Sequence, residues 1–101
     1  MRERKLIEER KQELLDAAIS LSKHMGYTHI TRDGIAQRVG VSYGLVTHYF
    51  KSMDNLRKVI MKEAIRNAIV EIVAQGLVCK DPLTKNLKPK LMKKVIAYLS
   101  K

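Results

Sequence analysis

This sequence of 101 residues lacks most features of secreted and membrane proteins. It has one cysteine, Cys79, so no disulfide can form within the chain, and we expect a reduced, cytoplasmic protein. No apolar run approaches the roughly 20 residues that cross a bilayer, and the segment MRERKLIEERK is too charged for a signal peptide. We therefore expect neither export nor a membrane partner.

Motifs that carry catalysis or bind metals are missing as well. The sequence contains no phosphate-binding glycine loop and no nucleophile motif. His24, His29 and His48 have no companion cysteine and no i,i+4 spacing, so we predict no metal site and no cofactor. We expect a protein that is not an enzyme.

The sequence has a large excess of positive charge. The formal net charge is +10, which favours a polyanionic partner, most often nucleic acid, and suggests association with the nucleoid. Residues 1–50 carry 8 Lys and Arg against 6 Asp and Glu, whereas residues 51–101 carry 12 against 4. The late lysines at 88, 90, 93 and 94 leave three interpretations open: a solvated face, an extra DNA contact or a membrane-surface helix.

Apolar residues at helical spacing predict an all-α protein of about five helices. Gly26 and Gly40 supply stop signals, while Thr31, Ser42 and Ser52 are suited to cap helix N-termini. The expected helices cover residues 7–25, 32–39, 43–50, 53–76 and 89–100. We predict a division into residues 1–76, a DNA-binding domain that includes the long fourth helix, and residues 77–101, a basic extension.

The segment AIVEIVA, residues 68–74, is apolar on almost every side of its predicted helix. Either a later segment or a second subunit must cover it. In the last helix we expect Leu91, Val95, Ile96 and Leu99 to face inward, which is too little to cover the whole surface. We therefore predict a homodimer, with its interface formed by Ile65, Ile69, Ile72 and Val73.

Two short helices separated only by GVS, residues 40–42, predict a homeodomain-like helix-turn-helix bundle. In this motif the second helix enters the DNA major groove. Gly40 would make the turn, and Gly44 would let the backbone of the second helix approach DNA. A packed helix pair without DNA binding is the alternative.

The segment TRDGIAQRVGVSYGLVTHYFKSMDNL, residues 31–56, resembles the DNA-binding domain of TetR-family transcriptional repressors. The resemblance extends from the middle of the first predicted helix to the start of the fourth, about half of the chain. Its matching positions are Thr31, Ile35, Ala36, Gly40, Val41, Ser42, Gly44, Phe50 and Leu56. It implies a repressor that binds double-stranded DNA as a dimer.

The sequence departs from the family pattern at three positions and in length. Thr47 replaces a usual aromatic residue, Met53 replaces a lysine, and Gly34 stands where an acidic residue is common. The family also carries a second helical domain that binds a small inducer, whereas this chain ends at Lys101. Since a few short helices leave little room for a ligand cavity, we expect no inducer pocket.

These considerations define a predicted DNA-binding set. Arg32, Tyr43 and Leu45 are expected to reach base edges, and hydroxyl, imidazole and lysine side chains to hold phosphates. The full set is Thr31, Arg32, Ser42, Tyr43, Gly44, Leu45, Thr47, His48, Tyr49 and Lys51.

The function expected from this set is sequence-specific regulation of transcription, most simply by a dimeric repressor that occupies its operator. Two alternatives stay open. One is an architectural or DNA-segregation protein that coats repeated sites. The other is a protein-interaction module that has lost DNA binding.

Overall fold

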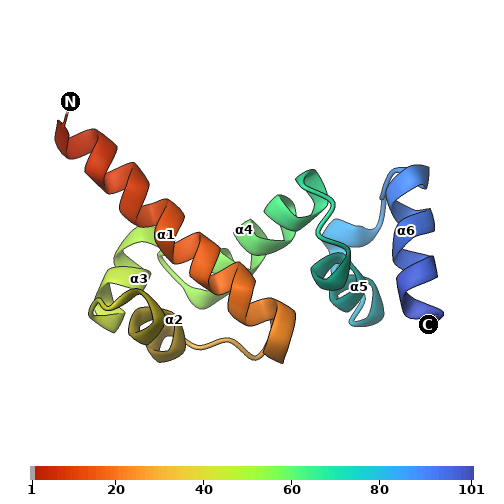
Figure 1. The fold of residues 1–101 in the computed structure, drawn as a ribbon, viewed down its shortest axis with the longest axis horizontal. Helices are drawn as coiled ribbons and strands as arrows, with labels where there is room; N and C mark the ends of the chain where they lie inside the picture. Colours follow the sequence, from red (N-terminus) through yellow and green to blue (C-terminus); the bar gives the residue numbers. More distant parts are fainter. Residues whose placement is uncertain (1) are drawn as a thin grey trace.

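A computed structural model describes residues 2–101, with side chains from Leu6 onward. These residues form six α-helices and one short 3-10 helix (Figure 1). They are α1 (Arg2–Met25), α2 (Arg32–Val39), α3 (Tyr43–Phe50), α4 (Met53–Arg66), α5 (Val70–Val78), η1 (Pro82–Thr84) and α6 (Pro89–Leu99). The predicted all-α class is confirmed.

The bounds of α2 were predictable because both ends have local signals. The Thr31 hydroxyl accepts a hydrogen bond from the Gly34 amide at 3.1 Å and so caps the helix. Gly40 has φ 84°, and its N–H donates to the Ala36 carbonyl at 2.8 Å. This left-handed conformation is the one that glycine adopts without strain, and it turns the chain into α3.

The predicted long fourth helix is wrong, because the chain breaks between Arg66 and Val70. Ala68 has φ 53°, a left-handed conformation that is uncommon for a residue with a side chain. The Ile69 amide donates to the Ala64 carbonyl at 2.8 Å and closes the end of α4. The break lets α5 turn and pack against α6, so the structure has one α-helix more than expected.

This turn changes the predicted dimer interface. Ile72 and Val73 are 0% exposed within the single chain, so in this conformation they are not available to a second subunit, and that part of the prediction is wrong. Ile65 and Ile69 are only partly buried against the core and stay accessible.

The prediction for α6 is correct in its bounds but only half correct in its buried face. Leu91 and Val95 are buried. Ile96 and Leu99 are 53% and 46% exposed, because α6 packs on α5 through a narrower stripe than the periodicity suggested.

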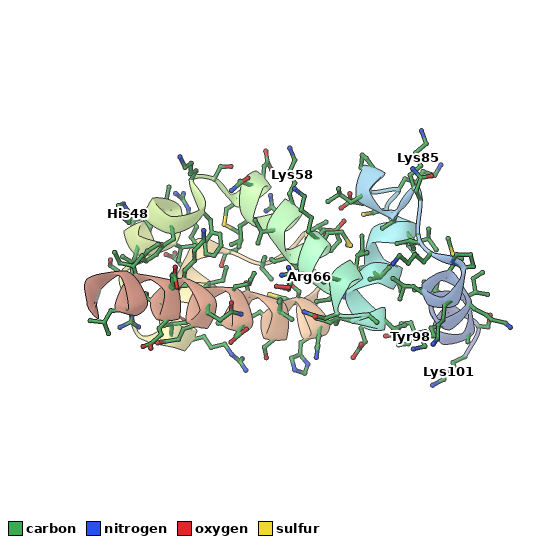
Figure 2. All side chains as sticks on the ribbon, turned by 90° about the horizontal axis from the view of Figure 1, so that it is seen from above. His48, Lys58, Arg66, Lys85, Tyr98 and Lys101 are labelled. Carbon is green, nitrogen blue, oxygen red and sulfur yellow. The ribbon has the colours of Figure 1, made fainter. Side chains whose placement is uncertain are left out.

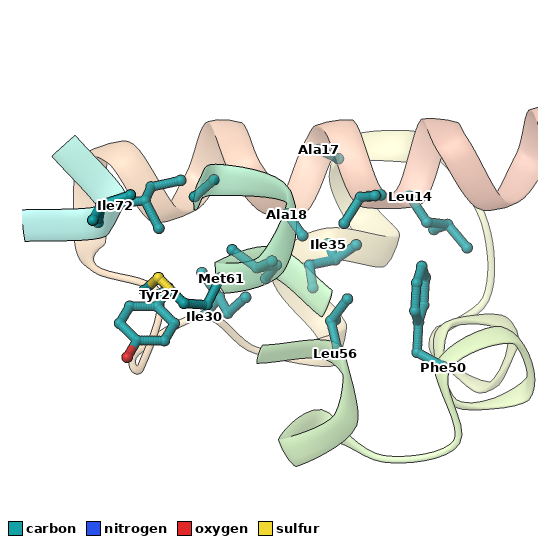
Figure 3. Packing of buried hydrophobic residues seen from close by; sticks show 14 of the residues in the cluster. Leu14, Ala17, Ala18, Tyr27, Ile30, Ile35, Phe50, Leu56, Met61 and Ile72 are labelled. Carbon is teal, nitrogen blue, oxygen red and sulfur yellow. The ribbon is translucent and has the colours of Figure 1, made fainter. Parts of the chain in front are cut away.

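The core around the predicted DNA-binding part joins four helices. Figure 3 shows the Phe50 ring of α3 among buried side chains that include Leu14 from α1, Ile35 from α2 and Leu56 from α4. The exposed fraction of each of these side chains is at most 1%. The orientation of α3 therefore depends on packing against all three of its neighbours.

Gly76 lies inside α5 and not at the end of the predicted helix. The predicted chain division at this residue therefore falls within a helix, and the division itself stays a prediction. A Cβ atom at Gly76 would collide with the Met61 side chain and would lie 2.9 Å from the Thr84 methyl group.

Because the Thr84 side chain is branched and buried, it cannot move aside easily. We expect Gly76→Ala to lower the free energy of unfolding by about 1–3 kcal/mol through overpacking, measured by urea denaturation. An unchanged midpoint would contradict this packing role.

A polar cluster fastens the end of α1 to α5. The Gln75 side chain accepts from the Tyr27 amide at 2.8 Å and donates to the Ser22 carbonyl at 2.9 Å. The Tyr27 hydroxyl donates to Asp81 at 2.6 Å and lies 3.3 Å from the Cys79 sulfur. Burial raises the pKa of Tyr27, and the bonds to Asp81 and Cys79 raise it further, so the phenol stays protonated.

Candidate nucleic-acid interface

The α2–α3 pair has the geometry of a helix-turn-helix unit. Ile35 and Val46 are buried between the two helices, and the amides of Gly40 and Val41 both donate to the Ala36 carbonyl, at 2.8 and 3.0 Å. The turn is therefore short and internally bonded, which leaves the opposite face of α3 free.

Every residue of the predicted DNA-binding set is at least partly accessible, with Leu45, Thr47 and Tyr49 half-buried.

The N-terminus of α3 is exposed from Ser42 to Gly44. Ser42 occupies the N-cap position, but its hydroxyl makes no capping hydrogen bond, which corrects the expectation that it caps the helix. A Cβ atom at Gly44 would meet no other atom within 4 Å. Gly44 is also absent from the residues with positive φ, so neither the fold nor the backbone conformation requires glycine there.

Arg32, Tyr43 and Thr47 form one connected cluster across the two helices. The Arg32 guanidinium donates to the Thr47 hydroxyl at 3.1 Å and lies 5.8 Å from the centre of the Tyr43 ring. This distance is within the range of a cation–π contact. The cluster holds the arginine beside the exposed start of α3, while the Thr47 hydroxyl proton remains available for another acceptor.

His48, Tyr49 and Lys51 lie near the C-terminal end of α3. The His48 and Tyr49 rings meet edge to face, with centroids 5.4 Å apart. Lys51 has φ 71°, and its amide donates to the Thr47 carbonyl at 2.7 Å, so it ends the helix while its side chain stays exposed.

Two basic residues connect the helix-turn-helix to α1 and were not among the predicted residues. The Lys11 ammonium lies 5.7 Å from the centre of the Phe50 ring, so α1 brings positive charge to the end of α3. Arg38 of α2 donates to the Ser20 hydroxyl at 2.9 Å. Neither position carries a local signal, because both depend on how α1 crosses the motif.

The described side chains do not form a metal site. Among the side chains from Leu6 to Lys101, no three His, Cys, Asp or Glu residues gather in a way that could hold a metal ion. None of the helices over these residues combines the length and the apolar character needed to cross a membrane.

Comparison with known proteins points to the same surface. The family described as bacterial regulatory proteins, tetR family, matches residues 14–60, a range that runs from the core of α1 into α4 and includes both helices of the motif. The predicted resemblance is therefore confirmed on the residues that carry it. No solved structure matches the chain significantly.

Several curated relatives are described as HTH-type transcriptional regulator BetI. The one from Serratia proteamaculans (strain 568) is 38% identical over 78 residues, which is 75% of this chain and 39% of the relative. The one from Cronobacter sakazakii (strain ATCC BAA-894) is 37% identical over 57 residues, or 56% of this chain and 28% of the relative. The chain therefore spans well under half the length of these relatives.

Proposed function

The chain belongs, through residues 14–60, to the tetR family of bacterial regulatory proteins, and from this premise we propose that it binds specific DNA sequences and regulates transcription. It would act as a dimeric repressor by occupying an operator, in the cytoplasm and associated with the nucleoid. Occupancy excludes other proteins from the same DNA and needs no chemistry.

A single observation supports this proposal: the exposed start of α3, where a Cβ atom at Gly44 would meet no atom within 4 Å, is flanked by the cluster of Arg32, Tyr43 and Thr47. Tyr43 is 58% exposed, although large aromatic side chains are usually buried. Arg32 is held in place without being neutralised by a carboxylate among the described ion pairs. Exposed side chains held in position at a helix start are what recognition of base edges requires.

Selection from random DNA duplexes, followed by footprinting, tests the proposal. One protected site of fixed length is the expected result. Footprints that spread far beyond the site would favour an architectural or DNA-segregation protein. A gel shift that is absent even at low salt would favour a protein-interaction module.

Replacing Arg32 and replacing Lys51 should weaken DNA binding in different ways. Arg32→Ala should cost about 1–3 kcal/mol on the selected site and little on random DNA, because it removes a base contact. Lys51→Ala should weaken binding to all sequences and reduce the slope of log affinity against log salt by about one, because it removes a phosphate contact. Titrations of both variants at several salt concentrations measure the difference, and equal losses on both DNAs for Arg32→Ala would exclude a base contact.

Dimerisation is proposed through the part of the predicted interface that stays accessible. Ile65 lies in the last turn of α4 and Ile69 lies in the break just before α5, and both are partly exposed. Ile69→Asp should convert a dimer into a monomer in sedimentation experiments, because a charge would be buried at the interface. A wild-type protein that sediments as a monomer at micromolar concentration would contradict the proposal.

We do not expect regulation by a small inducer. The earlier reason, that the short helices leave little room for a ligand cavity, needs revision. A surface hollow of about 520 Å³ lies beside α6, a volume within the range of small-ligand sites. Its lysines, Lys88, Lys90 and Lys94, are exposed and would not enclose a ligand. A thermal-shift screen with metabolites tests the expectation, and a specific hit that releases DNA would contradict it.

A further inference from the structure

The C-terminal end of the molecule carries a dense group of lysines that the contacts of the α2–α3 pair do not involve. We call it the lysine-rich end. Its members are Lys80, Lys85, Lys88, Lys90, Lys93, Lys94 and Lys101, all of them exposed. The interval from residue 80 to residue 101 contains one acidic residue, Asp81.

No carboxylate among the described side chains forms an ion pair with a lysine of this end. One oxygen of Asp81 accepts from the Tyr27 hydroxyl at 2.6 Å and the other accepts from the Leu83 amide at 2.9 Å. The ion pairs among the described side chains link Arg10 with Glu13, Arg57 with Asp54 and Arg66 with Glu63, so none of them involves the lysine-rich end. Unpaired like charges at close range repel one another, and a polyanion would relieve that repulsion.

The lysines also converge on one hollow. Lys88, Lys90 and Lys94 line the hollow of about 520 Å³ together with Arg66. Arg66 pairs with Glu63, which leaves three lysines without an ion-pair partner among the described side chains around this surface. Closely spaced lysines suit the phosphates of a nucleic acid.

The lysine-rich end lies far from the recognition helix. The molecule measures 42 Å along its longest axis. Figure 2 shows His48 of α3 at one end, and Lys85 and Lys101 on opposite sides of the other end. In this view Lys85 lies on the same side as His48 and Lys101 on the opposite side, so the positive surface extends around the far end.

We propose that the lysine-rich end is a second, sequence-independent DNA-binding surface, through which the protein holds a second duplex while α3 holds the first. The binding of the first duplex by α3 rests on the proposed function, whereas the binding of the second duplex does not. An anionic membrane fits less well, because Leu91 and Val95, the centre of the apolar face of α6, are buried against the protein itself. Helices that lie in a membrane surface need that face for insertion.

A capture assay tests the second surface. A short duplex with the selected site is immobilised, the protein is added, and retention of a second, fluorescent duplex of unrelated sequence is measured. Lys90→Glu/Lys94→Glu should reduce retention at least about tenfold. The control, Lys23→Glu/Lys62→Glu, removes the same charge at exposed positions of α1 and α4 and should change retention less than about twofold.

Gel shifts on the short duplex alone separate this inference from the proposed function. There the Lys90→Glu/Lys94→Glu variant should bind like wild type, whereas failure of wild type to bind would refute the proposed function instead. The second surface is refuted if bound wild type retains no second duplex, or if both double variants lose retention equally. It is also refuted if Lys90→Glu/Lys94→Glu loses affinity for the single short duplex. A variant that still retains the second duplex but no longer binds phosphatidylserine vesicles would refute it as well.

Discussion

Replacing Gly44 by valine should reduce affinity for the selected DNA site about a hundredfold, or roughly 2.7 kcal/mol, while the protein stays folded. A branched side chain at the start of α3 would hold the backbone away from base edges and phosphates, so several contacts would be lost together. Within the chain, a Cβ atom at this position meets nothing within 4 Å, so no clash opposes folding. Gel shifts and thermal unfolding measure the two effects separately.

Gly44→Ala is the matched control for the fold. In a helix, alanine is favoured over glycine by up to about 1 kcal/mol, so this variant should be more stable than wild type and still bind DNA less well. Opposite changes in stability and affinity are hard to obtain from general damage to the protein. If Gly44→Val bound the selected site with wild-type affinity, α3 would not be the recognition helix.

The largest expected loss of stability comes from Phe50→Ala. Truncating a fully buried phenylalanine removes its transfer free energy and leaves a cavity, for a total of about 3–5 kcal/mol. Phe50 is 1% exposed and packs where α3 meets α1 and α4. Because small domains have only about 5–15 kcal/mol of stability, much of this protein should be unfolded at moderate urea concentrations.

Tyr43→Ala provides a comparison within the same helix. It removes an aromatic ring that is 58% exposed, so the free energy of unfolding should change by less than about 1 kcal/mol. Urea titrations followed by circular dichroism compare the two variants. Equal midpoints would mean that Phe50 does not anchor α3 in the core.

The helix-turn-helix could be predicted because its signals are local. The Thr31 cap and the left-handed Gly40 each act within a few residues, and the side chains buried between α2 and α3 repeat at helical spacing. The break at Ala68 has no such signal. Neither glycine nor proline occurs from residue 64 to residue 72, and a left-handed alanine is held there by the packing of α5 and not by its own preference.

The predicted DNA-binding residues could likewise be predicted only as far as local signals allow. Residue types at the start of α3 indicated which side chains could face DNA, but the bond from Arg32 to Thr47 joins residues 15 positions apart. The bond from Tyr27 to Asp81 joins residues 54 positions apart. Such contacts depend on how helices are arranged in space, and a single sequence carries no periodicity or cap that specifies them.

The bonds of Gln75 have a consequence for the order in which the protein opens. The Tyr27 amide lies in the link between α1 and α2, outside both helices, and its acceptor is the Gln75 side chain of α5. Amide protons in links without such a bond usually exchange quickly with solvent. The Tyr27 amide proton can exchange only when α5 and the end of α1 separate. The link before the helix-turn-helix and α5 should therefore open together, and hydrogen exchange at the Tyr27 amide would report that opening.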